Sequence, residues 1–149
     1  MKKFIFFTGT TAGLALLLIT SVSSNAQTGT ISLTISALKS DRGKCLIYLY
    51  RSEGGFPVKP EAAFKKIVNE INGLQSSYEF KDIPFGVYAI SVVHDENNNG
   101  KLDTNLIGLP KEGIGVTNNA KGSFGPPKFK DAKFDHYKPL TTCYISISY

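Results

Sequence analysis

Apolar and polar residues alternate with the period of a β-strand in several stretches of this chain. Residues 31–36 (ISLTIS) alternate isoleucine or leucine with serine or threonine, which predicts a strand with one buried face. Residues 45–50 (CLIYLY) are apolar on both faces and predict a central strand. Because only the turn residues KSDRGK lie just before the second run, we expect the two strands to form a hairpin.

The strongest strand pattern lies between residues 76 and 95. A first run, with Tyr78 and Phe80 on one face, ends at the turn IPFG, and a second run covers Val87–His94. In the second run Tyr88, Ile90, Val92 and His94 share one face, and Val87, Ala89, Ser91, Val93 and Asp95 share the other. The chain closes with CYISISY (143–149), which predicts a final core strand.

Residues 60–71 are ambiguous, because Pro60 suits a helix start while Ile67 and Ile71 fit a helix or a strand. No other stretch predicts a helix. Several short strands separated by turn residues, with at most one short helix, predict an all-β fold, an antiparallel β-sandwich.

The segment from Asp103 to Lys133 is rich in glycine and proline and has little apolar periodicity. Loops of this length inside a domain are usually functional or disordered. Its apolar residues favour an ordered loop that packs against the domain: Leu106, Ile107, Leu109, Ile114, Val116 and Phe124.

The first 26 residues have the order of a secretory signal peptide: Lys2 and Lys3, an apolar stretch, then small residues ending at Ala26. An uncleaved membrane anchor is the alternative, but residues 8–11 interrupt the apolar run. Cleavage leaves one domain, residues 27–149, with no stable membrane span. We therefore expect a protein exported to the bacterial periplasm or the extracellular space.

The charge balance argues against nucleic acid as a partner. Loss of Lys2 and Lys3 reduces the seventeen basic residues to fifteen against twelve acidic ones, a charge of +3. Phosphate backbones require a denser basic surface. The lysines near the C-terminus alternate with Asp131 and Asp135 and predict a solvated face.

Both cysteines, Cys45 and Cys143, lie in the part expected to be exported, where thiols are normally oxidised. The sequence therefore predicts a disulfide between them. Two separate buried thiols are the alternative.

Residues 95–103 combine oxygen-bearing side chains with a turn. Asp95, Asn97, Asn99 and Asp103 stand at the first, third, fifth and ninth places of a Ca²⁺-loop pattern, with Gly100 at the turn and the Lys101 carbonyl at the seventh place. The twelfth place is Leu106, where such loops carry a bidentate glutamate. A weak Ca²⁺ site is predicted, unless Glu112 or loop carbonyls complete the shell.

A cation-free turn is the alternative for this stretch. Asn99-Gly100 is a strong signal for a two-residue type I′ hairpin, because both residues tolerate positive φ. Such a turn does not require Asp95, Asn97 and Asp103 in register.

Catalytic motifs are absent from the sequence: there is no G-x-S-x-G, no H-E-x-x-H and no phosphate-binding glycine loop. A hydrolase using Asp95, Glu112 and His94 is the alternative function, and it requires these side chains to converge. A buried imidazole with a backbone partner is the simpler interpretation of His94.

Three motifs resemble a bacterial secreted family, domain of unknown function 2141. They are the P-x-G-x-Y-A turn (Pro84 to Ala89), the H-D-E-N-x-N-G-K-L-D loop (His94 to Asp103) and the G-x-P-K-E-G-x-G segment (Gly108 to Gly115) followed by P-x-F-x-x-A (Pro127 to Ala132). The resemblance implies export and a β-sandwich and gives no activity. The P-x-G-x-Y turn is also similar to that of transthyretin-like domains, so we expect an immunoglobulin-like or transthyretin-like sandwich. The expected function is a non-catalytic binding or envelope-associated module, with an envelope protein or glycan as the candidate partner.

Overall fold

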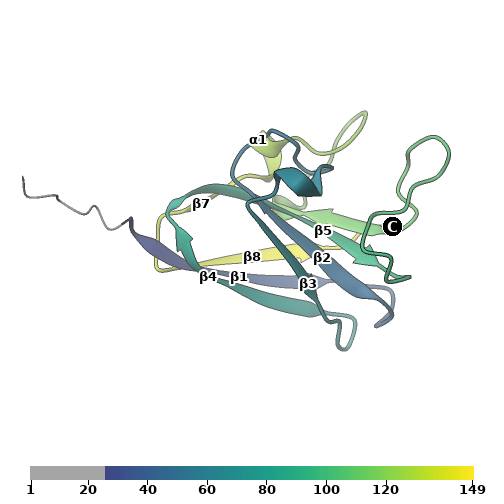
Figure 1. The fold of residues 1–149 in the computed structure, drawn as a ribbon, viewed down its shortest axis with the longest axis horizontal. Coiled ribbons are helices and arrows are strands. Elements are labelled where there is room, and N and C mark those ends of the chain that lie inside the picture. The colour runs from purple at the N-terminus through teal and green to yellow at the C-terminus, as the bar shows by residue number, and fades with distance from the viewer. Residues whose placement is uncertain (1–25) are drawn as a thin grey trace, which may run out of the picture.

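The computed structural model describes residues 26–149, whose strands form two layers (Figure 1). Nearly all of the predicted signal peptide lies outside these residues. No described helix is long and apolar enough to cross a membrane. The elements are β1 (Thr28–Ser36), β2 (Lys44–Tyr50), η1 (Pro60–Ala62), β3 (Lys65–Asn69), β4 (Ser76–Pro84), β5 (Gly86–Asp95), β6 (Gly113–Val116), η2 (Thr117–Asn119), α1 (Phe129–Ala132), β7 (Phe134–His136) and β8 (Leu140–Ser146).

Two sheets make up the sandwich. The smaller one has the order β4-β1-β8, and the larger one has the order β3-β2-β5-β6, with β7 pairing to the part of β5 that β6 leaves free. The all-β, sandwich-like class predicted from the sequence is confirmed. One pair departs from the antiparallel expectation, because β1 and β8 run parallel from Thr30 opposite Leu140 to Ser36 opposite Ser146.

The hairpin predicted for residues 31–36 and 45–50 is wrong. β1 pairs with β4 and β8, whereas β2 pairs with β3 and β5 in the other sheet. The connection between them crosses from one layer to the other and buries Leu38 in the core, which leaves that side chain 2% exposed. A tight hairpin turn would have left Leu38 in solvent, so its burial favours the crossing.

Residues 60–71 divide between the two predicted possibilities. Pro60 begins the single 3₁₀ turn η1, and the chain then becomes the edge strand β3. Ile67 packs against the core, while Lys65, Lys66 and Val68 are exposed. A strand with one open edge accommodates this mixture better than a helix.

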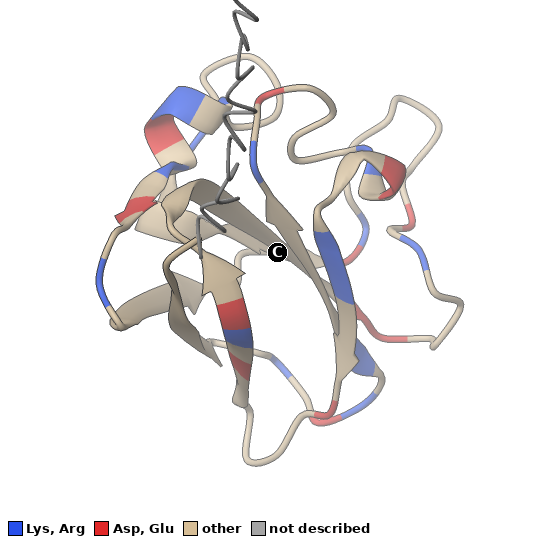
Figure 2. Cartoon of the chain, turned by 60° about the vertical axis from the view of Figure 1, so that its left-hand side comes forward, with Lys and Arg blue, Asp and Glu red and all other residues tan. Residues whose placement is uncertain are grey.

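Hydrophobic residues gather on both faces of the larger sheet. Figure 2 shows most charged residues in loops, short helices and edge strands. The main core lies between the sheets; its largest fully buried members are Ile31, Leu33, Ile35, Ile47, Leu49, Ile83, Tyr88, Ile90 and Ile145. A second cluster covers the other face of the larger sheet: Leu46, Tyr48, Tyr50, Phe56, Ala89, Val93, Val116 and Ala132. Residues 28–149 thus contain both sheets and both clusters.

The glycine-rich segment 103–133 is ordered, but only part of it packs as predicted. Ile114 and Val116 lie in β6 and contact the second cluster. The prediction is wrong for the remaining four apolar residues, because they sit at loop tips and are exposed: Leu106, Ile107, Leu109 and Phe124.

The predicted disulfide does not form. Cys45 lies in β2 and Cys143 in β8, on different sheets, and each is a free, buried thiol. Burial raises the pKa of Cys45 to about 11 and the pKa of Cys143 to about 12, although a hydrogen bond with Ser76 partly lowers that of Cys45. The alternative of two separate buried thiols describes the structure.

The thiols give a direct test of this arrangement. At neutral pH both are protonated and shielded, so we expect the folded protein to react very slowly with a disulfide reagent such as DTNB. After unfolding in denaturant without reductant, two thiols per chain should react. If none reacts until a reductant is added, the cysteines are bridged and the two strands lie differently from this structure.

Candidate functional site

The candidate cation loop connects the strongest strand to the long glycine-rich segment. β5 ends at Asp95 and β6 begins at Gly113, with His94 and Gly113 opposite each other in the ladder. Residues 96–112 therefore leave and re-enter the sheet at one place. We call residues 95–103 the polar loop.

Asp95 fixes the start of the polar loop. Its side chain is buried, with 2% of the residue exposed, and its two oxygens accept hydrogen bonds from the backbone N–H groups of Asn99 (3.0 Å) and Gly100 (2.7 Å). The side chains of Asn97 and Asn99 continue the pattern, since their Oδ1 atoms accept from the N–H groups of Asn99 and Lys101. The loop is a series of side-chain turns that satisfies its own backbone.

Asp103 closes the polar loop. Its Oδ2 accepts a hydrogen bond from Nδ2 of Asn97 at 2.7 Å and another from Nδ2 of Asn99 at 2.9 Å. The hydrogen bond from Asn97, and to a lesser extent the one from Asn99, holds the pKa of the Asp103 carboxyl below its usual value. Asp103 therefore joins both asparagine side chains at one oxygen.

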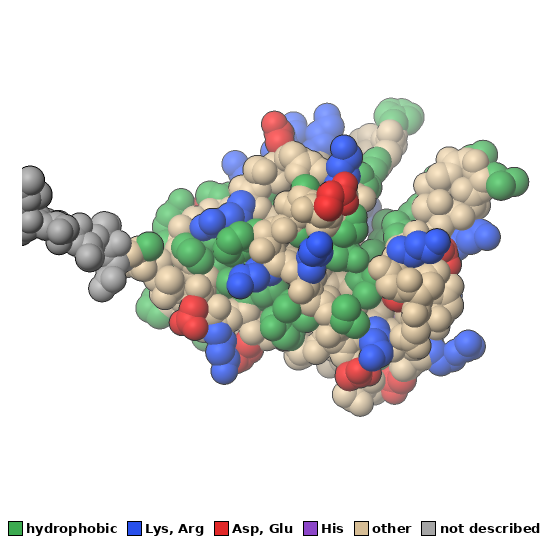
Figure 3. Space-filling view, in the orientation of Figure 1, with side chains coloured by type: hydrophobic (Ala, Val, Ile, Leu, Met, Phe, Trp, Pro, Cys, Tyr) green, Lys and Arg blue, Asp and Glu red, His purple; other side chains and the backbone are tan. Residues whose placement is uncertain are grey.

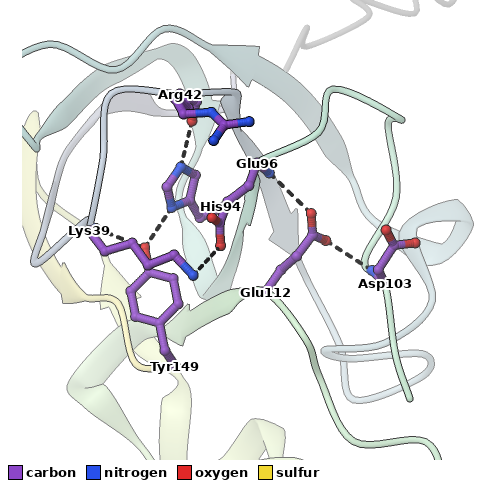
Figure 4. Close-up of polar contacts among 7 residues, drawn as sticks. All are labelled: Lys39, Arg42, His94, Glu96, Asp103, Glu112 and Tyr149. Carbon is purple, nitrogen blue, oxygen red and sulfur yellow. Dashed lines mark hydrogen bonds and ion pairs between the residues drawn. The ribbon is translucent and has the colours of Figure 1, made fainter. Parts of the chain in front are cut away.

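Glu112 joins the two ends of the polar loop from below, as Figure 4 shows. Its Oε1 accepts from the N–H of Glu96 at 3.1 Å and its Oε2 from the N–H of Asp103 at 2.9 Å. Glu112 is 6% exposed, so these bonds are shielded from water. The sequence suggested Glu112 as a possible cation ligand or catalytic residue. It did not reveal that Glu112 accepts the N–H groups of Glu96 and Asp103, because no local motif marks an acceptor for distant backbone groups.

The alternative of a two-residue type I′ hairpin turn at Asn99-Gly100 is wrong. In the structure Asn98 and Gly100 have positive φ, of 59° and 78°, and Asn99 is not among the residues with positive φ. A type I′ turn at Asn99-Gly100 requires positive φ at both central residues. The polar loop is longer than such a turn and is organised by its side chains.

His94 is a structural residue. It is fully buried; Nδ1 lies 2.6 Å from the hydroxyl of Tyr149 and Nε2 lies 2.7 Å from the carbonyl oxygen of Arg42 (Figure 4). Lys39 completes the arrangement, with its Nζ 2.8 Å from Glu96 and 4.5 Å from the centre of the Tyr149 ring. The simpler interpretation of His94 is confirmed, and Tyr149 and Arg42 are partners that sequence reasoning did not find.

The hydrolase alternative requires His94, Asp95 and Glu112 to converge, and their hydrogen bonds lead elsewhere. His94 contacts Tyr149 and Arg42, while Asp95 and Glu112 each accept two backbone N–H groups. None of these bonds joins one of the three to another. A general base needs access to its substrate, and the three residues are all at least nine-tenths buried.

The polar loop fits a hard cation in part. Its donors are oxygens, as Ca²⁺ prefers, and an amide oxygen that accepts one N–H retains a lone pair for a cation. Among the described residues, however, no group of three or more His, Cys, Asp or Glu side chains could hold a metal ion. Glu112 and Asp95 each have both oxygens engaged by backbone N–H groups, so either would bind a cation through its remaining lone pairs or by releasing the backbone. Of the two carboxylates at ligand positions, Asp95 is engaged by the backbone and Asp103 by side-chain amides, which implies weak binding.

These features define a class: a small all-β sandwich whose strongest strand runs into an internally hydrogen-bonded polar loop. The family model described as "Uncharacterized protein conserved in bacteria (DUF2141)" matches residues 33–143, from β1 into β8 and across the whole loop. The chain belongs to this family, and the resemblance noted in the sequence is confirmed. Neither the curated proteins nor the solved structures include a significant match.

Proposed function

We propose that this protein is an exported, non-catalytic binding module of the bacterial envelope in which a Ca²⁺-type cation braces the polar loop. The observation that carries the proposal is the convergence of three side chains at one point. Two amides, from Asn97 and Asn99, meet a single oxygen of Asp103. A cation in that position would attract the amide oxygens in place of the amide nitrogens, at the cost of the hydrogen bonds that the N–H groups of Asn99 and Lys101 donate to those oxygens.

The residues in the proposed roles follow the loop pattern. Asp95, Asn97, Asn99 and Asp103 would supply side-chain oxygens, and Lys101 its carbonyl oxygen. The bound cation would supply positive charge that ties the two arms of the loop together.

A non-catalytic role agrees with the hydrogen bonding of the candidate acids and bases. His94, Asp95 and Glu112 are each occupied in holding the backbone or the C-terminal Tyr149. The family assignment gives no activity. Export remains part of the proposal and depends on residues 1–26; detection of the mature chain beginning at Gln27 in the periplasm or medium would test it.

Calcium is expected to raise the melting temperature of residues 27–149. With a dissociation constant of ~10⁻⁴ M and ~1 mM Ca²⁺, binding adds about 1.4 kcal/mol to the free energy of unfolding. For a domain of this size that corresponds to about 5 °C, measured by thermal melting in Ca²⁺ and in EDTA.

Two variants make the melting experiment specific. Asp103→Ala removes a proposed ligand and should abolish the calcium-dependent increment, whereas Asp135→Ala, at an exposed aspartate on β7, should leave it intact. Equal melting temperatures of the wild-type protein in Ca²⁺ and EDTA would remove the cation from the proposal.

A further inference from the structure

Two loops carry apolar side chains at their outer ends. In the first, residues 105–109, Leu106 is fully exposed, Ile107 is 79% exposed and Leu109 is 56% exposed. In the second, residues 121–126, Phe124 is fully exposed. We call these segments the leucine tip and the phenylalanine loop. Both project from the same side of the sandwich in Figures 1 and 2, and Figure 3 shows two protrusions with hydrophobic ends.

The leucine tip is ordered by its own hydrogen bonds. The N–H of Asn105 donates to the carbonyl of Leu109 at 2.8 Å, and the N–H of Gly108 donates to the carbonyl of Asn105 at 3.0 Å. The side-chain oxygen of Asn105 accepts from the N–H groups of Ile107 and Leu109. The N–H groups of four of the five tip residues therefore have acceptors within the tip.

This internal bonding matters because a backbone N–H without a partner costs several kcal/mol in a hydrocarbon environment. A loop that satisfies its own N–H groups can leave water at much lower cost. The leucine tip thus combines exposed apolar side chains with backbone N–H groups most of which have acceptors within the tip.

The phenylalanine loop is narrow at its base and anchored on both sides. A Cβ on Gly122 would collide with the carbonyl oxygen of Gly125, so the two arms of the loop are in contact at this point. On the far side Phe129 packs against the second cluster, and Asn118 holds the carbonyl groups of Asp131 and Lys133. Phe124 is consequently presented outward on a fixed base.

Lysines flank both tips in the sequence, and one acid from another segment, Glu53, lies beside Lys128 and Lys130 at the base of the phenylalanine loop. Lys101 and Lys111 flank the first, and residues 121–130 contain three lysines and no acidic residue. Of the acids in residues 101–131, Glu112 is buried beneath the loop, Asp103 is half-buried and Asp131 is exposed. Lysine is depleted at protein–protein interfaces, whereas anionic lipid headgroups attract it. Two separate convex apolar tips also suit a deformable bilayer better than the continuous apolar core of a protein interface.

We propose that the leucine tip and the phenylalanine loop dock this protein on a bilayer surface that contains anionic phospholipid. The apolar side chains enter the boundary between headgroups and acyl chains, and the lysines contact the headgroups. The inference goes beyond the proposed function, since the tip is held by bonds that do not involve the ligands of the polar loop.

A tryptophan reporter tests this directly, because the chain contains no tryptophan. In residues 27–149, Phe124→Trp and Leu106→Trp each place one reporter at a tip, and Leu140→Trp places a control on an exposed position at the start of β8. With vesicles made of equal parts phosphatidylcholine and phosphatidylglycerol, emission from the tip reporters should shift to shorter wavelength and be quenched by brominated acyl chains. The control should do neither.

Co-sedimentation with the same vesicles separates the two contributions. Leu106→Ser and Phe124→Ser should each weaken partitioning about tenfold, and Lys121→Ser and Lys128→Ser about fivefold each. The matched controls Leu140→Ser, Lys65→Ser and Lys66→Ser should change it little. Because all these side chains are exposed, unchanged melting temperatures should accompany every variant.

Several results would overturn the inference: no emission shift at either tip, equal binding to pure phosphatidylcholine vesicles, or an emission shift without vesicles as protein concentration rises. The last would indicate association of two copies. Every measurement is made in Ca²⁺ and in EDTA. Absence of vesicle binding in both buffers contradicts the bilayer inference, whereas absence of the calcium-dependent melting shift contradicts the proposed cation site.

Discussion

Replacing Glu112 by alanine should lower the free energy of unfolding by about 3–5 kcal/mol. The carboxylate accepts the N–H groups of Glu96 and Asp103 at a site sheltered from water. Its removal deletes two charge-assisted hydrogen bonds, each worth about 1.5–3 kcal/mol, and leaves shielded donors without partners. Urea denaturation gives the size of the effect.

Hydrogen exchange locates the same effect within the chain. In Glu112→Ala the amide protons of Glu96 and Asp103 should lose protection, while those in the paired strands β1 and β4 keep it until global unfolding. Glu112→Gln is the matched control, since its amide oxygen can still accept one of the two N–H groups and should retain roughly half of the lost stability. A loss below about 1 kcal/mol for alanine would mean that water replaces the carboxylate and that the loop is not tied to β6.

Replacing Thr117 by valine is the second large expected effect, about 2–4 kcal/mol in the free energy of unfolding. The hydroxyl of this buried residue donates to the carbonyl of Ala132 at 2.6 Å and accepts from the N–H of Ile90 at 3.0 Å. Valine has nearly the same shape, so the loss isolates hydrogen bonding from packing. These two hydrogen bonds connect α1 with the central strand β5. They thereby also hold the base of the phenylalanine loop, which leads into α1.

Thr117→Ser separates the hydroxyl from the methyl group. Serine keeps both hydrogen bonds and should cost about 1 kcal/mol for the missing methyl. In Thr117→Val the Ile90 amide should exchange faster than in the serine variant. A denaturation midpoint for Thr117→Val equal to that of the wild-type protein would show that the hydroxyl contributes nothing to holding α1.

The strands were predictable because each carries its burial pattern locally. Ile31, Leu33 and Ile35 alternate with polar residues and are all fully buried, and both faces of Val87–His94 pack as the alternation predicts. The period of two specifies which face a residue occupies but says nothing of which sheet the strand joins. That is why residues 31–36 and 45–50 were paired incorrectly.

The turn at Pro84 shows that a short motif can specify local structure without specifying sheet topology. The buried Tyr88 donates its hydroxyl to the carbonyl of Pro84 at 2.7 Å, so the P-x-G-x-Y spacing has a physical cause in one hydrogen bond. Gly86 lies between them, where a Cβ would come within 3.4 Å of the Tyr88 ring. β4 and β5 nevertheless belong to different sheets, which the motif did not reveal.

The candidate site was predictable in composition and only partly in geometry. The alternation of Asp95, Asn97 and Asn99 indicated an organised loop, and their hydrogen bonds to the loop backbone are local in sequence. Glu112 acts on Glu96 across sixteen residues, and no local pattern encodes such a distance. Similarly, hydrophobicity alone could not distinguish the buried Val116 from the exposed Leu106, because exposure depends on where the fold places a loop end.

The parallel pairing of β1 with β8 affects how the chain can fold. The middle strand of the smaller sheet, β1, needs β8 on one side, so that sheet stays incomplete until residues 140–146 are available. Pairing of such distant segments slows folding, typically to milliseconds or seconds. A chain still emerging from the ribosome therefore lacks one edge of its sandwich, and removal of the final ten residues should leave a species that collapses without reaching the native state.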